Sequence, residues 1–502
     1  MSNQPTMIDI VNIEAKRTLD DYAQFAHLSE HVARLIEEAS WLVPKLKGRK
    51  VWMINSTAQG GGVAEMLPCM VQTMRELGVD CSWAVIRSDR ASFFDMTKNL
   101  HNLIHGFGRP ALSDDDVKLY EDVNARCAAA FADRVNPGDV LVVHDPQPAA
   151  MGAALKRLRR VSLLWRCHIG LDERNANTSV AWRFLKPYLE PCDRAVFSAP
   201  EYIPDYLAGR SSVIYPAIDP LSKKNRELSV HKLVGILCNA NLSLERHPVL
   251  TPPFAAPALR LQEDGSFRPA LSSDDVGLLY RPVVLQISRW DRLKGFLPLL
   301  HAFRRLKESR TGRSERNTRR IEILRLVLAG PDPTSIQDDP EGSEALQELT
   351  SAYRHLPPAL REDIAIFALP MSSRKHNALM VNALQRCATI VVQNSLREGF
   401  GLTATEAMWK RKAVLTSRAC GLRHQIHDGV NGRSVPDAED VPYLAQILDE
   451  MLAAPQQRDV WGRSAQRCVQ QHFLVFQQVA TWLRVLTEVA AQPPASSPFL
   501  RP

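Results

Sequence analysis

Long apolar runs are absent from this sequence. No stretch reaches the roughly 18 consecutive apolar residues that a transmembrane helix needs. The opening residues, MSNQPTMIDIVNIEAK, contain acids and lack the apolar core of a signal peptide. We therefore expect neither membrane insertion nor secretion.

A cysteine pairing pattern is also absent. Nine cysteines are scattered along the chain without a C-x-x-C motif, and several lie in apolar runs typical of strands or helices. This usage indicates reduced, buried thiols and predicts a cytoplasmic protein.

The chain has no strong excess of charge. Its formal net charge is +7 over 502 residues. The one dense basic run, Arg304 to Arg320, lacks the interleaved aromatic side chains typical of a nucleic-acid surface, so we expect a solvated helix end and loop there. A hydrophobic content of 45% and this length instead indicate a globular protein of two domains.

The most informative stretch runs from Cys387 to Thr416. It contains a short apolar run, Ala388 to Gln393, typical of a buried parallel strand, and a helical pattern from Thr403 to Lys412. The turn between them, EGFGL, carries two glycines where the free amides and positive dipole end of the helix would lie. Such a turn predicts a site for an anionic group such as a phosphate.

Two carboxylates, Glu398 and Glu406, bracket this turn. A retaining glycosidase pair lies about 5–5.5 Å apart, whereas eight helical residues span roughly 12 Å, so the spacing disfavours that chemistry without excluding it. We favour an interpretation in which each acid binds a different hydroxyl-rich group, one a sugar and one a ribose. Taken alone, Glu398 also fits a helix-dipole carboxylate and Glu406 a surface helix residue.

The segment EGFGLTATEAMWKRKAV resembles the E-x7-E region of retaining glycosyltransferases of family 4, in the nucleotide-glucose-dependent trehalose synthase branch. Further matching pieces are NSTAQGGGVAEM, VHDPQPA, WRCHI and SRWDRLKG, and the resemblance extends from about Val51 to Ala453. Residues 240–280 and the segment GLDERNANTSVAW depart from the pattern. The resemblance implies an α/β fold of GT-B architecture, with two facing Rossmann-like doubly wound domains and an interdomain cleft.

A glycine loop follows the first predicted strand, Arg49 to Asn55. Three adjacent glycines, Gly60, Gly61 and Gly62, would let the backbone approach a ligand closely. The loop is not a Walker A motif, because no Gly-Lys-Ser/Thr follows, and a plain tight turn remains open. The resemblance implies that the loop lies over the donor sugar and diphosphate.

Two polar positions follow later strands of this half. Asp145 comes after the strand Asp139 to Val143, and His168 comes after Ser162 to Cys167. The carboxyl ends of parallel strands border the ligand crevice of a doubly wound sheet. An Asp that caps the turn and a satisfied histidine are the alternatives, and no spacing supports a metal site. The resemblance implies that Asp145 binds an acceptor hydroxyl and that His168 contacts the transferred sugar near its 6-hydroxyl.

Two cations follow a strand that opens the second half, Pro282 to Ser288. Arg289 and Lys294 leave its carboxyl end five residues apart and can converge on a diphosphate. Surface salt bridges are the alternative. The resemblance assigns both cations to phosphate binding, and the helix that follows is predicted over Phe296 to Glu308.

The expected domain plan has five parts. Residues 1–17 form a flexible arm, 18–238 an acceptor domain, 239–280 a linker or crossover, 281–490 a nucleotide-sugar domain, and 491–502 a disordered tail. The last helices are candidates to pack back on the N-terminal domain.

The resemblance implies transfer of glucose from a nucleoside diphosphate glucose to free glucose, which gives α,α-trehalose. Arg289, Lys294 and the amides of Phe400, Gly401 and Leu402 would stabilise the leaving diphosphate. Glu398 would bind the donor sugar and Glu406 the ribose, and no metal is required.

The alternatives are a trehalose phosphorylase, a family 4 transferase with another acceptor, and a sugar- or nucleotide-binding regulator without turnover. The expected partners are a nucleotide-sugar and a sugar acceptor, without nucleic acid. The nucleotide base, the acceptor and the oligomeric state, a homodimer included, stay open.

Overall fold

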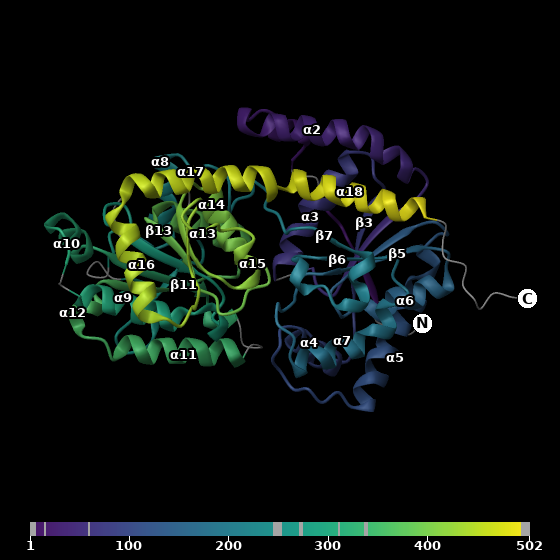
Figure 1. Cartoon of the computed structure of the whole chain (residues 1–502), viewed down its shortest axis with the longest axis horizontal. Coiled ribbons are helices and arrows are strands. Elements are labelled where there is room, and N and C mark those ends of the chain that lie inside the picture. Colours follow the sequence, from purple (N-terminus) through teal and green to yellow (C-terminus); the bar gives the residue numbers. More distant parts are fainter. Residues whose placement is uncertain are drawn as a thin grey trace, which may run out of the picture. The chain divides into compact units, whose positions relative to one another are not determined.

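The computed structural model describes residues 7–14, 17–58, 61–243, 254–270, 275–309, 312–335 and 340–492. It divides into two compact units (Figure 1). Unit 1 comprises Met1–Ala217 with His472–Pro502, and unit 2 comprises Ile218–Gln471. Each has its own sheet and helices.

The sheet of unit 1 has the order β1-β3-β2-β4-β5-β6-β7, and all its pairs are parallel except β1 with β3. Its central strands are buried along their whole length, as expected of a parallel sheet covered on both faces. The strands are β1 (Ile8–Val11), β2 (Val51–Asn55), β3 (Cys81–Ile86), β4 (Val140–His144), β5 (Ser162–Cys167), β6 (Arg194–Phe197) and β7 (Ser211–Val213).

The helices of unit 1 begin at recognisable caps. Ser113 and Asp116 form a capping box at the start of α5, and Asn175 caps α7. The helices are α1 (Leu19–Ala23), α2 (Ala26–Leu42), α3 (Gly61–Glu76), α4 (Ala91–Ile104), α5 (Asp114–Phe131), α6 (Ala149–Leu158), α7 (Ala176–Leu189) and α18 (Val475–Ala491).

Two features of unit 1 bear on the expected domain plan. The prediction of a flexible arm does not hold for residues 8–11, because they form the edge strand β1, which pairs antiparallel with β3. The C-terminal helix α18 packs on α2 and α3 (Figure 1), so the end of the chain belongs with the N-terminal sheet. Of the predicted tail, residues 493–502 lie outside the described residues.

The sheet of unit 2 has the order β15-β14-β13-β10-β11-β12-β8-β9. Strands β10 to β15 pair in parallel, and β8 and β9 add an antiparallel edge. The strands are β8 (Leu259–Leu261), β9 (Phe267–Arg268), β10 (Val283–Ile287), β11 (Arg325–Pro331), β12 (Ile364–Leu369), β13 (Ile390–Gln393), β14 (Ala413–Ser417) and β15 (Arg433–Val435).

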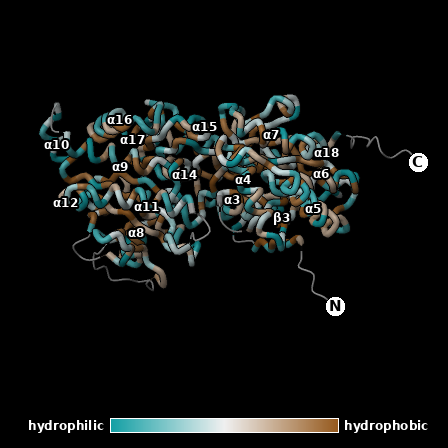
Figure 2. Tube along the Cα trace, turned by 90° about the horizontal axis from the view of Figure 1, so that it is seen from below, coloured by the Kyte–Doolittle hydropathy of each residue, from teal (hydrophilic) through white to brown (hydrophobic). Residues whose placement is uncertain are grey.

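Helices of unit 2 pack apolar side chains against this sheet. Leu299, Phe303 and Leu448 are among the buried side chains that α9 and α16 bring to the core, and Figure 2 shows brown hydrophobic and teal hydrophilic stretches alternating along the tube. The helices are α8 (Val230–Asn239), α9 (Phe296–Glu308), α10 (Glu315–Glu322), α11 (Pro340–Arg354), α12 (Pro358–Arg361), α13 (Arg374–Cys387), α14 (Leu402–Trp409), α15 (Cys420–Arg423), α16 (Val441–Ala453) and α17 (Pro455–His472).

The boundary between the units lies earlier than expected. The Asn382 side chain donates to the carbonyl oxygens of Lys223 and Arg226, and Trp409 Nε1 donates to the carbonyl of Asn225. These bonds attach residues 218–226 to unit 2 rather than to the acceptor domain. Part of the predicted linker is also sheet, since β8 pairs with β12, whereas residues 244–253 and 271–274 lie outside the described residues.

Both sheets contain a point at which the strand order reverses. In unit 1 the reversal lies between β2 and β4, and in unit 2 between β10 and β13. Ligands of open α/β sheets bind beyond the carboxyl ends of the strands at such points. We therefore expect the predicted site residues to lie at these two places.

Two further observations concern the class of protein. All nine cysteines belong to the described residues, and each is free. Within the described ranges, the search for a helix with enough length and apolar character to cross a bilayer finds none.

Candidate active site

Lys294 and Glu398 meet at the reversal point of unit 2. Lys294 ends the 3-10 turn η6 (Arg292–Lys294) after β10, and Glu398 lies in the loop after β13. Because these strands are neighbours, Lys294 Nζ lies 2.8 Å from Glu398 Oε2, with side chains 14% and 12% exposed. The structure thus brings together two residues that the sequence predicts as catalytic.

Glu398 is held by further hydrogen bonds. Ser395 Oγ donates to Glu398 Oε2 at 3.0 Å and Gln393 Nε2 donates to the same oxygen at 3.3 Å. A carboxylate held in this way has little rotational freedom, and a buried ion pair with extra hydrogen bonds is a defined arrangement rather than a surface contact.

A buried glutamine joins the two loops. Gln286 Nε2 donates to the Lys294 carbonyl at 2.7 Å, and the Asn394 amide donates to Gln286 Oε1 at 3.2 Å. Gly295, with φ of +65°, lies so close that an added Cβ would stand 2.0 Å from the Asn394 carbonyl oxygen. The register of the loops therefore depends on a glycine at this position.

The helix α14 begins directly beside the ion pair. Gly401 precedes it with φ of +89°, and a Cβ there would meet the Leu422 side chain at 2.6 Å and Glu398 Cγ at 3.2 Å. The Gln425 side chain donates to the carbonyl of Phe400, which orients the turn. The amide end of α14 is thus close to Lys294, which is the arrangement expected of an anion site.

Glu406 is buried rather than on a surface. It is 5% exposed, and its Oε1 lies 3.6 Å from Lys224 Nζ. Lys410, one turn further along the chain, donates to the Glu406 carbonyl, to Gln385 and to Asn225, and burial lowers the pKa of its ammonium. Glu398 and Glu406 thus contact different lysines. This arrangement suits two separate binding roles better than joint attack on one glycosidic bond.

Arg289 differs from Lys294 in its surroundings. It is exposed, and within the described part of the chain no hydrogen bond or ion pair of its side chain is found. It follows the same strand as Lys294, so both cations leave the same edge of the sheet.

Unit 1 gathers a second group of polar side chains. His144 ends β4 and His168 follows β5, and the parallel pairing of these strands places His144 Nδ1 3.0 Å from His168 Nε2. Asp145 lies between them in sequence, with φ of +63°, and its Oδ1 accepts the His168 amide at 2.9 Å. Positive φ is uncommon for a residue other than glycine and occurs at functional sites.

Arg166 completes this group. Its buried guanidinium donates to Ser198 Oγ at 3.1 Å and to the Ile214 carbonyl at 2.8 Å. Burial lowers the pKa of His144 to about 3 and, with Arg166 and His144, lowers the pKa of His168 well below its ordinary value. Burial raises the pKa of Asp145 to about 6, although the His168 amide and Arg166 act against it.

The lowered pKa values of His144 and His168 make both imidazole rings neutral, which determines how their nitrogens donate and accept. Since each neutral ring has one donor and one acceptor nitrogen, one of the facing nitrogens donates to the other. The outer nitrogens, His144 Nε2 and His168 Nδ1, are buried and have no hydrogen-bond partner among the described residues. One of them therefore offers a proton and the other a lone pair.

The glycine loop is only partly described. Gly61 is the first residue of α3 and Gly62 the second, whereas Gly60 lies outside the described residues. The loop follows β2, the strand next to β4, so it belongs to the same edge as Asp145. Its contact with a sugar or diphosphate stays a prediction.

Several site residues escaped the sequence analysis. Gln286, Gln393, Ser395 and Gln425 hold the unit 2 loops, and Arg166 supports the unit 1 group. A polar residue at the end of an apolar strand, as in VVLQI and IVVQ, is the signal that could have found two of them.

Comparison with known proteins identifies the family of this chain. Residues 53–204 match the family of the trehalose synthase N-terminal domain, and residues 279–467 match glycosyl transferases group 1. A trehalose synthase of Pyrococcus horikoshii is 32% identical over 475 residues, which cover 94% of this chain and 97% of that protein. The chain belongs to the trehalose synthase family.

The chain shares its fold with solved structures of other proteins. The α,α-trehalose 6-phosphate synthase of Burkholderia multivorans superposes with a TM-score of 0.64 at 15% identity, covering 88% of this chain and 97% of that one. A trehalose phosphorylase of Grifola frondosa is 25% identical over 80% of this chain and 52% of its own length. The chain is a GT-B hexosyltransferase related to trehalose metabolism.

Proposed function

We propose that this chain is a retaining glucosyltransferase that uses a nucleoside diphosphate glucose as donor and glucose as acceptor, with α,α-trehalose as product. The observation that carries the proposal is the Lys294–Glu398 ion pair at the carboxyl ends of β10 and β13, beside the amide end of α14. A cation and a helix amide end suit a diphosphate, and a fixed carboxylate suits sugar hydroxyls.

In this proposal the residues of unit 2 bind the donor. Lys294 and Arg289 neutralise the charge that develops on the leaving diphosphate, together with the amides of Phe400 to Leu402. Glu398 accepts hydrogen bonds from the donor glucose, and Glu406 accepts them from the ribose. The cations supply the charge neutralisation that a metal ion would otherwise provide, so we expect activity in the presence of a chelator.

The residues of unit 1 bind the acceptor and the far side of the transferred glucose. Asp145 accepts a hydrogen bond from an acceptor hydroxyl through Oδ2, since its Oδ1 already accepts the His168 amide. His168 binds the transferred sugar through a nitrogen whose proton depends on His144. Retention follows from attack on the same face of the sugar that the diphosphate leaves.

The test is a donor and acceptor screen. The purified chain is mixed with UDP-, ADP- and GDP-glucose, each with and without glucose, in the presence of EDTA, and nucleotide release is measured. Proton NMR of the product then shows whether both anomeric protons are α. Nucleotide release that is indifferent to added glucose, or a β linkage, would contradict the proposal.

A trehalose phosphorylase is the second candidate, favoured by the similarity to the enzyme of Grifola frondosa. It would cleave trehalose with inorganic phosphate and release glucose 1-phosphate. Incubation of the chain with trehalose and phosphate, without nucleotide, selects between the two: glucose 1-phosphate formation supports the phosphorylase, and its absence alongside donor-dependent synthesis supports the transferase.

A further inference from the structure

A second charged site lies at the amino ends of the unit 2 strands, opposite the carboxyl ends that Lys294 and Glu398 follow. A cavity of about 490 Å³ is lined by Pro282, which directly precedes β10, and by Thr389, which directly precedes β13. Because the catalytic candidates follow the carboxyl ends of these strands, the cavity belongs to the amino ends and is a separate site. Its volume falls within the roughly 300–1,000 Å³ of small-molecule pockets.

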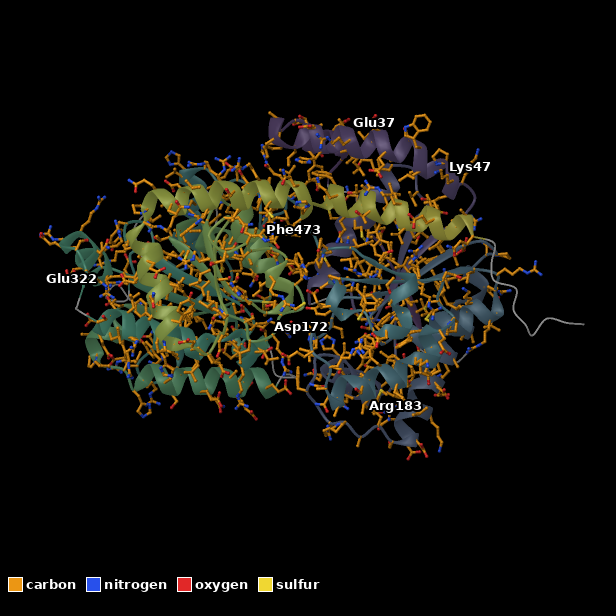
Figure 3. The ribbon with its side chains drawn as sticks, viewed as in Figure 1. Glu37, Lys47, Asp172, Arg183, Glu322 and Phe473 are labelled. Atoms are coloured by element: carbon orange, nitrogen blue, oxygen red, sulfur yellow. The ribbon has the colours of Figure 1, made fainter. Side chains whose placement is uncertain are left out.

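Arginines dominate the wall of this cavity, and none of its lining residues is acidic. They come from three separate parts of the chain: the segment before β10, helix α10 and helix α17. The arginines are Arg281, Arg316, Arg319, Arg320 and Arg458. Helix α10 lies at the end of unit 2 in Figure 1, and Glu322, labelled in Figure 3, is its last residue.

Some of these guanidiniums are anchored while they keep donors for a ligand. Arg320 Nη1 donates to the Leu452 carbonyl at 2.5 Å, and Arg458 Nη1 donates to the same carbonyl at 2.8 Å. Both are therefore held at the C-terminal end of α16, through one of their nitrogens. Burial and the nearby Arg320 hold the pKa of Arg458 below its ordinary value, which shows that like charges converge here.

The remaining arginines have donors to spare. Within the described ranges Arg316 has no hydrogen bond or ion pair, Arg319 contacts only the exposed Glu315, and the buried Nε of Arg281 has no hydrogen-bond partner. Guanidinium forks bind phosphate oxygens two at a time, and an anion would relieve the repulsion among them. The dense basic run seen in the sequence therefore contributes to a concave site and not only to a solvated helix.

We propose that this arginine cavity is a binding site for a small, multiply charged phosphate compound, distinct from the donor site. A small ligand is favoured over nucleic acid because the five arginines line one open pocket of about 490 Å³ and not an extended surface. Tyr280 is 61% exposed at its rim, which leaves room for a sugar or base attached to the phosphate.

The experiment uses inorganic pyrophosphate as the probe, measured by isothermal titration calorimetry on the full chain. The test variant is Arg316→Gln with Arg319→Gln, since both side chains are exposed on α10 and neither anchors the fold. The matched control is Arg463→Gln with Arg467→Gln, which removes the same charge from exposed positions of α17 that do not line the cavity. All proteins are also measured with Lys294→Ala, so that binding at the donor site is separated from binding at the cavity.

We expect the wild type and the control to bind pyrophosphate in the Lys294→Ala background, and the test variant to bind about tenfold or more weakly. Basal transferase activity should be the same in the test and control variants. Equal weakening in the two variants would show diffuse charge attraction, and no binding in the Lys294→Ala background would show that the cavity is not a site. Either result overturns the proposal.

Two further titrations address the ligand. Glucose 6-phosphate tests for a sugar phosphate, and its competition with pyrophosphate supports the assignment. A single-stranded RNA oligonucleotide that binds the wild type and is not displaced by pyrophosphate would overturn it in favour of a nucleic-acid surface.

Discussion

Lys294 and Glu398, 104 residues apart in the chain, form an ion pair of 2.8 Å at the reversal point of the unit 2 sheet. Their side chains are largely buried, and Glu398 also accepts hydrogen bonds from Ser395 and Gln393. Loss of either charge would leave the other buried without its partner, which is more costly than loss of a surface pair. The first prediction follows from this relationship.

We predict that Lys294→Ala lowers kcat by about 10²–10³-fold, because a preorganised cation that stabilises a developing charge contributes about 2.7–4 kcal/mol. The control is Arg292→Ala, since Arg292 lies on the same turn but pairs with Glu348 on an exposed surface. Initial rates of nucleotide release measure both. A comparable loss in the two variants would indicate damage to the turn rather than loss of a catalytic cation.

The buried Asp145 carboxyl should make the transferase activity depend on pH. Since burial raises its pKa to about 6, the carboxylate that accepts a hydroxyl is lost as the pH falls through 6, and kcat/KM should fall with one proton below that pH. Asp145→Asn should lower kcat/KM by about tenfold or more, in line with about 1.5–3 kcal/mol for a hydrogen bond to a charged group. Rate profiles between pH 5 and 8 check both statements.

The raised pKa of Asp145 should also make the folded protein less stable at high pH. Asp145 has a higher pKa when folded than when unfolded, so the folded protein binds more protons between the two values and loses stability as the pH rises through them. Asn accepts the positive φ and carries no charge. Asp145→Asn should therefore raise the melting temperature at pH 8 and leave it nearly unchanged at pH 4; a gain of the same size at both values would contradict this account.

We predict that His144 acts by positioning the His168 ring. His144→Phe keeps a ring but removes the nitrogen that faces His168 at 3.0 Å, so His168 loses the bond that selects its tautomer. We expect kcat to fall by about 10–100-fold with little change in KM for the donor, by analogy with residues that orient ligands of an active centre. Nitrogen-15 NMR of the His168 ring reports the tautomer directly, and the exposed His355→Phe is the control.

We predict that a side chain at Gly295 destabilises unit 2. Gly295→Ala places a methyl group 2.0 Å from a carbonyl oxygen at positive φ, and backbone strain with overpacking should lower the free energy of unfolding by about 2–5 kcal/mol. Gly429→Ala has a similar φ of +74° but open space around the added carbon, so it should cost only about 1–2 kcal/mol. Urea unfolding followed by tryptophan fluorescence compares them, and equal losses would show that the close approach at Gly295 is not a constraint.

Much of the candidate site was predictable because it follows strands. The predicted strand Ser162 to Cys167 and the predicted helix Phe296 to Glu308 have the same bounds in the structure, whereas the predicted strand Ala388 to Gln393 begins two residues later, at Ile390. Asp145 and Arg289 follow strands β4 and β10 within two residues, and Lys294 and Glu398 lie in the loops that follow β10 and β13. The edge strand β1 was not predictable in this way, because a four-residue strand in a polar segment is stabilised by its partner and not by its own pattern.

The amino-acid sequence alone determined the succession of strands and helices, the glycines at the turns and the chemical types at the strand ends, since these depend on local periodicity and backbone conformation. Only the tertiary structure decided that β10 lies beside β13 and β4 beside β5, so that Lys294 meets Glu398 and His144 meets His168. It also decided that Lys224 pairs with Glu406 and that arginines from three segments line one cavity. The reason is that pairing of distant segments depends on burial shared by the whole sheet, which no single stretch of sequence contains.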